Sequence, residues 1–185
     1  MYKYTLIVGK TAIKKSQPLK LTPLPSLYNH FSSKEELVET MYEFLREEAK
    51  KNAHIGPIDY TSLFQGRTAL DVLKITIGGY FNMNQQEHML NFYKVIYSER
   101  SLQPMAAKIV VEETEKMINA TKQLFYAMQV HQLLHFNNPD MSALSFALTV
   151  HGLMDFALDQ TNTGNEANNK LDDYLEWFCE ENAVR

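Results

Sequence analysis

The chain has 185 residues, of which 45% are hydrophobic and 22% charged, a size and balance typical of one globular domain with a small appendage. Its single cysteine, Cys179, excludes a disulfide framework within the chain and a zinc site built from cysteines. No apolar run is long enough for a signal-peptide core or a membrane span, so we expect a cytoplasmic protein. The net charge is −4.

The charge is unevenly distributed along the chain. Residues 1–34 contain six lysines and no acidic residue, while the remainder contains twelve basic and 22 acidic residues. A basic end on an acidic body indicates that one end meets a polyanion, although a lysine-rich arm without fixed structure gives the same pattern. Pro18, Pro23 and Pro25 exclude a regular helix across the first 25 residues.

A strong start signal for a helix follows this segment. Ser32 with Glu35, or Ser33 with Glu36, forms a capping box, and an apolar face continues from Leu37. We therefore expect a long helix over residues 33–52, which ends in a loop at Gly56-Pro57.

Five further segments have apolar residues at helical spacing. They cover residues 68–81, 87–99, 104–130, 139–159 and 170–182, and prolines open two of them, at Pro104 and Pro139. Residues 131–140 form a connector, and no alternating strand pattern or internal repeat is present. The sequence predicts an all-α protein.

The segment 139–159 is apolar on nearly all sides and must be covered on nearly all sides. We expect it to form a two-fold dimer interface with the last helix, although a central buried helix within a monomer would have the same composition. The interface residues we expect are Phe146, Val150, Leu153 and Trp177. His151 and Asp155, one turn apart, can pair with each other, bond across a dimer interface or line a pocket.

Methionine and aromatic residues are concentrated between residues 80 and 97. Such density usually means core, but it also lines permissive cavities for small molecules. We expect a cavity for a small, partly apolar effector, bordered by Tyr80, Phe92, Tyr93, Tyr97, Phe125, Met128 and His151.

No motif indicates catalysis, a metal or a cofactor. The stretch "VGKT" at 8–11 lacks the glycine that a phosphate-binding loop needs at position 4, where Tyr4 stands. His131 and His135 have the spacing of a helical metal pair but lack the adjacent glutamate of a zinc protease. No nucleophile elbow is present either, so we expect no enzyme.

The stretch "PSLYNHFSSKEELVETMYEFL", residues 25–45, closely resembles the end of the helix-turn-helix in TetR-family transcriptional regulators. In that family a short recognition helix carries a Leu-Tyr-x-His-Phe signature and is followed by Ser-Lys-Glu-Glu-Leu at the start of a long connecting helix. The resemblance implies a DNA-binding region over residues 1–50 and a larger antiparallel helical bundle over 51–185 that binds an effector and dimerises.

The resemblance also implies roles for individual residues. Tyr28 and His30 would bond phosphates beside the major groove, Ser26 would face the groove, and Lys34 would pair with the DNA backbone. The implied function is a ligand-responsive repressor that binds its DNA operator as a homodimer.

The first 24 residues depart from the family pattern. A helix-turn-helix needs two helices as a platform for its recognition helix, and "KKSQPLKLTPL" fits neither of them. We therefore expect a degenerate or truncated platform and weakened operator binding. The alternative function is a dimeric ligand-binding or interaction module that has lost specific DNA binding through an altered N-terminus.

Overall fold

The computed structural model describes residues 30–52, 58–84, 87–163 and 169–184. Within these ranges the chain forms seven helices and no strand, so the all-α prediction is confirmed. The helices are α1 (Lys34–Asn52), α2 (Tyr60–Phe64), α3 (Ala69–Asn84), α4 (Glu87–Glu99), α5 (Pro104–Val130), α6 (Pro139–Asn162) and α7 (Lys170–Glu181). Six of them match the expected segments, and α2 is additional.

The chain divides into two compact units, Met1–Leu37 and Val38–Arg185. In the first unit the described residues are the start of α1 and its cap. The Ser33 side chain accepts a hydrogen bond from the Glu36 amide at 3.1 Å, and the Glu36 carboxylate accepts from the Ser32 amide at 2.7 Å. Ser33 therefore caps the Glu36 amide, as the Ser33–Glu36 register requires, but the bond back to the Glu36 carboxylate comes from Ser32 and not from Ser33. The Ser32 hydroxyl also donates to the Glu36 carboxylate, and this bond, followed by the bond from the Ser32 amide, lowers the pKa of Glu36.

The short helix α2 has a local cause that the apolar spacing did not reveal. The Asp59 carboxylate caps it by accepting hydrogen bonds from the amides of Thr61 and Ser62. Gly66 then adopts a φ of +68°, a left-handed conformation that glycine takes without steric cost, and turns the chain into α3.

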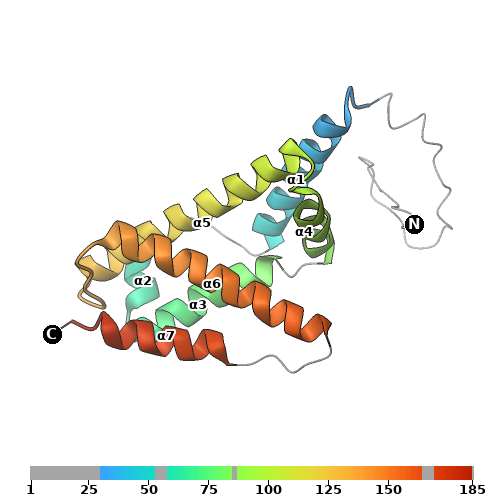
Figure 1. Ribbon diagram of the computed structural model, residues 1–185. Coiled ribbons are helices and arrows are strands. Elements are labelled where there is room, and N and C mark those ends of the chain that lie inside the picture. The colour runs from blue at the N-terminus through green and yellow to red at the C-terminus, as the bar shows by residue number, and fades with distance from the viewer. Residues whose placement is uncertain (1–29, 53–57, 85–86, 164–168, 185) are drawn as a thin grey trace, which may run out of the picture. The chain divides into compact units, whose positions relative to one another are not determined.

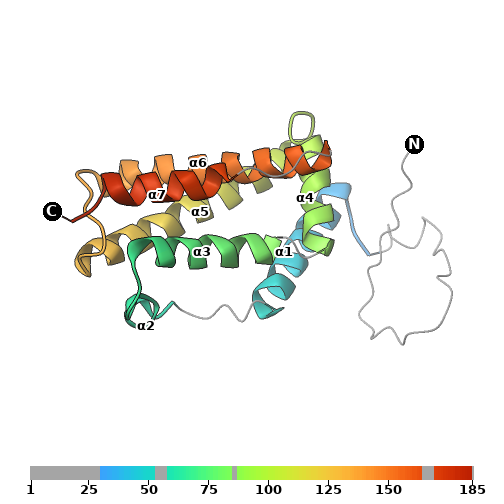
Figure 2. The ribbon, with the colours of Figure 1, turned by 90° about the horizontal axis from the view of Figure 1, so that it is seen from below.

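The larger unit is organised around α5. Figures 1 and 2 show α5 and α6 lying antiparallel and side by side, with α7 next to α6. Two hydrophobic clusters lie along α5. The first joins its C-terminal half to α2, α3, α6 and α7, and contains Phe64, Val72, Leu73, Leu124, Phe125, Met128, Leu134, Phe136, Ala143, Phe146, Val150, Leu175 and Phe178. The second joins its N-terminal half to α1 and α4, and contains Tyr42, Phe92, Ile96, Ala106 and Ile109.

Phe125 is the centre of the first cluster. It is fully buried, and its ring centroid lies 4.5 Å from Phe136, 5.1 Å from Phe146 and 5.5 Å from Phe178. Phe136 comes from the connector between α5 and α6, which also bonds the end of α7 through the His135 amide and the Asn182 carbonyl at 2.8 Å. The connector is therefore part of the core.

The sequence predicts no segment that is long and apolar enough to span a membrane, but helix α6 meets that criterion. The segment Pro139–Gln160 of α6 contains an 18-residue window with a mean hydropathy of 1.4, and it is long and apolar enough, by length and composition, to cross a bilayer. A single such helix is weak evidence, because the core helix of a soluble bundle meets the same criterion.

Replacing Phe125 by alanine tests the aromatic core. We expect Phe125→Ala to lower the free energy of unfolding by about 3–5 kcal/mol, because it removes three ring contacts and leaves a cavity. The control is Val111→Ala on the same helix, where the side chain is 55% exposed and the change should stay within about 0.5 kcal/mol. Urea unfolding followed by circular dichroism measures both, and equal effects would contradict a core centred on Phe125.

Candidate effector site

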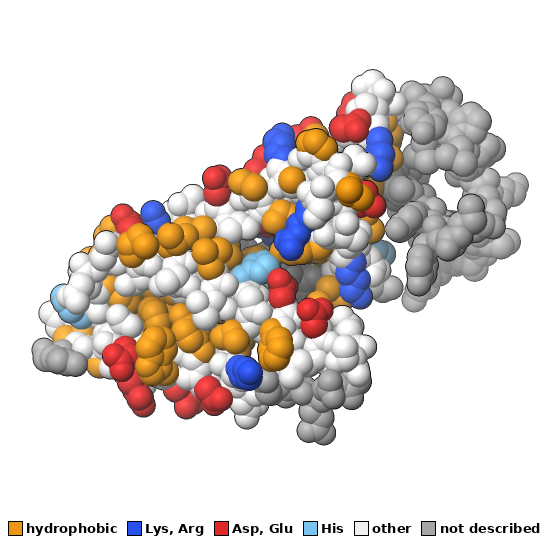
Figure 3. Space-filling model, in the orientation of Figure 1, with side chains coloured by type: hydrophobic (Ala, Val, Ile, Leu, Met, Phe, Trp, Pro, Cys, Tyr) orange, Lys and Arg blue, Asp and Glu red, His pale blue; other side chains and the backbone are white. Residues whose placement is uncertain are grey.

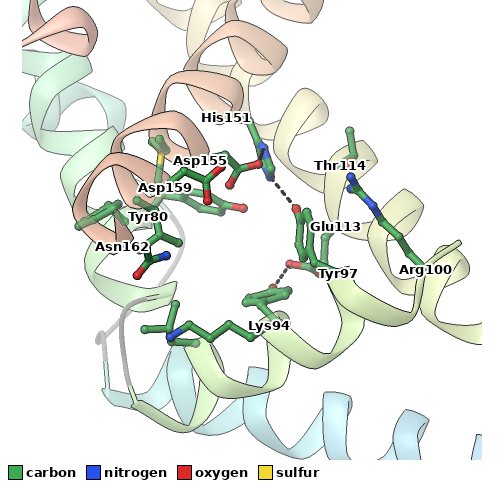
Figure 4. Close-up of a pocket in the computed structure, with 15 residues that line it drawn as sticks. Tyr80, Lys94, Tyr97, Arg100, Glu113, Thr114, His151, Asp155, Asp159 and Asn162 are labelled. Carbon is green, nitrogen blue, oxygen red and sulfur yellow. Dashed lines mark hydrogen bonds and ion pairs between the residues drawn. The ribbon is translucent and has the colours of Figure 1, made fainter. Parts of the chain in front are cut away.

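A cavity of about 430 Å³ lies in the larger unit, between α3, α4, α5 and α6 (Figure 4). Its size is that of a small-molecule site. Its lining comprises Tyr80, Phe81, Leu90, Tyr93, Lys94, Tyr97, Arg100, Glu113, Thr114, His151, Met154, Asp155, Leu158, Asp159 and Asn162. The lining contains both apolar and charged side chains, so the cavity can take an occupant that is both apolar and polar.

The carboxylate of Glu113 lies on the α5 wall of this cavity and is almost fully buried, with its side chain 8% exposed. It accepts hydrogen bonds from the hydroxyls of Tyr42 on α1 and Tyr93 on α4, the latter at 2.9 Å. Lys116 donates at 3.2 Å from the next turn of α5. One carboxylate thus joins three helices.

A further cation neutralises this buried charge. Arg46 Nη1 on α1 lies 3.1 Å from Glu113 Oε2, but Nη1 makes no aligned hydrogen bond, so the pair is held by electrostatic attraction. Burial alone would raise the pKa of Glu113, but the hydrogen bonds from Tyr42, Tyr93 and Lys116 and the Arg46 charge together outweigh burial and hold this pKa below its ordinary value. Glu113 is therefore ionised at neutral pH.

The tyrosines around Glu113 remain protonated because burial and the Glu113 charge both disfavour a phenolate. Burial, followed by the neighbouring Glu113 charge, raises the pKa of Tyr93 well above its ordinary value. Burial and the hydrogen bond to Glu113 likewise raise the pKa of Tyr42. Both phenols therefore act as hydrogen-bond donors, and neither supplies a phenolate nucleophile at neutral pH.

A second polar chain connects α4 to α6. The Tyr97 hydroxyl lies 2.9 Å from His151 Nε2, and His151 Nδ1 lies 3.3 Å from Asp155 Oδ2. The Asp155 carboxylate is an acceptor, so His151 Nδ1 is the donor of this pair. Burial and then the Asp155 charge raise the pKa of Tyr97 to about 12. This series of contacts orients the three side chains, and the raised pKa keeps Tyr97 protonated at neutral pH.

The expected effector residues divide into two groups. Tyr80, Tyr93, Tyr97 and His151 line the cavity, and His151 pairs with Asp155 as one of the expected alternatives. The other three residues are core and do not line the cavity, because their helices turn these side chains toward neighbouring helices. Phe92 stacks on Tyr42 in the second cluster, and Phe125 and Met128 are fully buried in the first.

Sequence reasoning named Asp155 as a residue that can line a pocket but missed the other charged residues of the cavity, above all Glu113. A signal was present, since Ala106, Ile109 and Glu113 are spaced three and four residues apart and share one helical face. A lone acid in an apolar stripe indicates a buried carboxylate with partners elsewhere in the fold.

The expected interface residues are also divided. Phe146 and Val150 are buried in the core of the chain, since α6 turns them toward α5 and α7, and they offer no free surface. Leu153 is half-buried, while Trp177 is 53% exposed.

Of the expected DNA-binding residues, Ser26 and Tyr28 lie outside the described residues. His30 and Lys34 are both exposed, and Lys34 is the first residue of α1.

Removing the Glu113 charge tests the buried cluster. We expect Glu113→Gln to lower the free energy of unfolding by roughly 3 kcal/mol at pH 7, because Arg46 and Lys116 lose their counter-charge. The control is Glu112→Gln, whose carboxylate is 40% exposed and should matter little.

The effect of Glu113→Gln depends on pH with a defined sign. The folded-state pKa of Glu113 is depressed, so its contribution is present above the unfolded-state value of about 4.3 and is lost as the pH falls through the folded-state value. The difference between wild type and variant, measured by urea unfolding, should therefore shrink below about pH 4. A difference independent of pH would contradict a charged Glu113.

Comparison with known proteins provides no independent assignment. The chain matches no protein-family model, and no curated protein or solved structure is significantly similar to it. The functional assignment rests on the residues and geometry of the chain itself.

Proposed function

We propose that this chain is a TetR-like, ligand-responsive transcriptional regulator, a homodimer in which a small effector controls DNA binding. One observation carries the proposal. The Glu113 carboxylate on the wall of the cavity is held by Tyr42 and Arg46 of α1, and only two residues separate α1 from the "LYNHF" stretch that resembles a recognition-helix signature. The effector site and the helix that leads to the DNA-binding region therefore share one hydrogen-bonded group.

The mechanism follows from that shared group. Tyr93 donates to Glu113 and also lines the cavity, so an effector in contact with Tyr93 alters the bonds that fix α1. A tilt of α1 would change the distance between the two DNA-binding regions of a dimer, and the half-sites of an operator would no longer be matched. Effector binding would then release the DNA.

The dimer is supported by an exposed apolar face on α6 and α7. Met141, Leu148 and Phe156 on α6 are 56%, 48% and 43% exposed, and Trp177 on α7 is 53% exposed. The three α6 residues are seven and eight positions apart and share one side of the helix. Figure 3 shows hydrophobic side chains gathered along α6 and α7. Contact with a second copy would remove this surface from water.

A second candidate function is supported by the prolines at positions 18, 23 and 25. Without a two-helix platform, the chain would be a dimeric effector-binding module that has lost specific DNA recognition. The two candidates agree on the dimer and the cavity and differ only in DNA recognition.

A charge on the exposed α6–α7 face tests assembly. We expect the wild-type protein to sediment as a dimer at micromolar concentration, and Trp177→Glu or Leu148→Glu to sediment as monomer or aggregate, because a carboxylate would be buried without a partner. Val111→Glu is the control, since Val111 is 55% exposed on α5, outside this face. A wild-type monomer would end the proposal of a homodimer.

A salt titration tests DNA recognition. The probes are the DNA just upstream of the gene that encodes this chain and random DNA of equal length. Because the prolines occupy the expected platform, we expect weak binding that falls steeply with salt and is nearly alike for both probes. Binding that prefers the upstream DNA near 0.15 M salt would establish the complete repressor instead.

Two lysine variants separate the phosphate contact from general charge. If Lys34 contacts a phosphate, Lys34→Gln should reduce the slope of log K against log salt by about 0.9. Lys51→Gln, at the other end of α1, removes the same charge and should leave the slope unchanged. Equal slopes for both variants would contradict a contact from Lys34.

A further inference from the structure

The lining of the cavity indicates the chemical class of its occupant. We propose that it binds an organic cation with flat aromatic rings, seated between the tyrosine rings and the carboxylates of Asp155 and Asp159. This inference rests on the proposed function, because it concerns the same effector site.

Aromatic rings form the walls. Tyr80 and Phe81 come from α3, and Tyr93 and Tyr97 come from α4, so rings face the cavity from two helices. Aliphatic side chains complete these walls, namely Leu90, Met154 and Leu158. Ring faces attract cations electrostatically, and flat ligands stack on them.

The carboxylates select the sign of charge. Asp155 and Asp159 lie one turn apart on α6, and in Figure 4 both lie beside Tyr80 at the edge of the cavity. The partner of Asp155 is the His151 ring, with Nδ1 3.3 Å from Oδ2, and in the part of the chain that the structure describes no lysine or arginine pairs with Asp155. Among the described residues no cation pairs with Asp159. These acids are a source of attraction for a cation next to ring faces.

Two basic residues, Lys94 and Arg100, also line the cavity, and their geometry does not make it an anion site. The Arg100 guanidinium lies 4.8 Å from the centroid of the Tyr97 ring, and Figure 4 shows it beyond that ring from the centre of the cavity. Lys94 is exposed and lies along the edge opposite Asp155, on a flexible stem that can turn to solvent. An anion in the centre would meet the α6 carboxylates.

The third carboxylate of the lining, Glu113, offers an occupant hydrogen-bond acceptor atoms but little net charge. Glu113 is neutralised by Arg46 and Lys116, as described above. The volume of about 430 Å³ admits a molecule of two or three fused rings and excludes a macromolecule. No group of three or more histidine, cysteine or acidic residues among the described residues is arranged to hold a metal ion, so a bare metal ion is a poorer occupant.

The test uses two fluorescent probes with the same three-ring skeleton and opposite charge, N-methylacridinium and anthracene-9-carboxylate. We expect N-methylacridinium to bind the full chain with its fluorescence quenched, and the anion to bind at least tenfold more weakly. The double variant Asp155→Asn/Asp159→Asn should weaken binding of the cation about tenfold or more, since each carboxylate contributes a charge at short range. Asp173→Asn/Asp172→Asn on α7 removes the same charge outside the cavity and should leave the affinity within about twofold.

Every outcome decides the inference. Binding of neither probe, equal or tighter binding of the anion, or a cation affinity unchanged in the Asp155/Asp159 variant would overturn it. Circular dichroism of both variants checks that each is folded, and Lys94→Gln should strengthen cation binding in the folded wild-type background. The measurement needs no DNA and no dimer, so its failure leaves the regulator to be judged by sedimentation and DNA titration, and failure of those tests leaves the cation site standing.

Discussion

The burial of one carboxylate, Glu113, determines how the α1, α4 and α5 helices are held. A buried charge is costly unless its lone pairs are satisfied and its charge is neutralised. Here the hydrogen-bond donors to Glu113 come from all three helices. All three helices must therefore be in place to offset the free energy of burying the charge. An apolar residue at position 113 could fill the same space, but it would not require this particular placement of Tyr42 and Tyr93. The carboxylate therefore specifies an arrangement more than it adds stability.

The two halves of α5 consequently differ in character. The C-terminal half is packed with rings around Phe125, and an interior of that kind is close-packed and resists small shifts. The N-terminal half is held by hydrogen bonds and an ion pair next to a cavity, and polar contacts can be exchanged for contacts with a ligand. In the proposed regulator, the aromatic half is the rigid base and the polar half is the part that responds. The cavity lies against this polar half, so in the proposed regulator an effector there would be placed to act on α1.

Much of the fold follows from local patterns, and less of the site does. Apolar spacing and the prolines at 104 and 139 locate six helices, because both act within one or two turns. The five-residue α2 was missed because a single turn is too short to show a period, although Asp59 ahead of Thr61 and Ser62 was a capping signal. The site depends on how helices face one another, which periodicity within one helix does not determine. Phe125 and Tyr93 are both aromatic residues in segments with helical spacing, and the sequence does not distinguish them. In the structure Phe125 is the centre of the core, while Tyr93 lines the cavity.

The distribution of charge bears on both DNA binding and effector binding in the proposed function. The body carries the acidic excess and the first 34 residues carry six lysines, so a polyanion such as DNA is attracted to one end and repelled by the rest. The same acidic body raises the local concentration of small cations. Asp155 and Asp159 extend this negative potential into the cavity, next to the tyrosine rings. An anionic effector would be attracted by the lysine-rich end and repelled at the cavity, where its binding is needed. A cationic effector avoids this conflict, because it does not compete with DNA for the lysines and it is drawn to the acidic body.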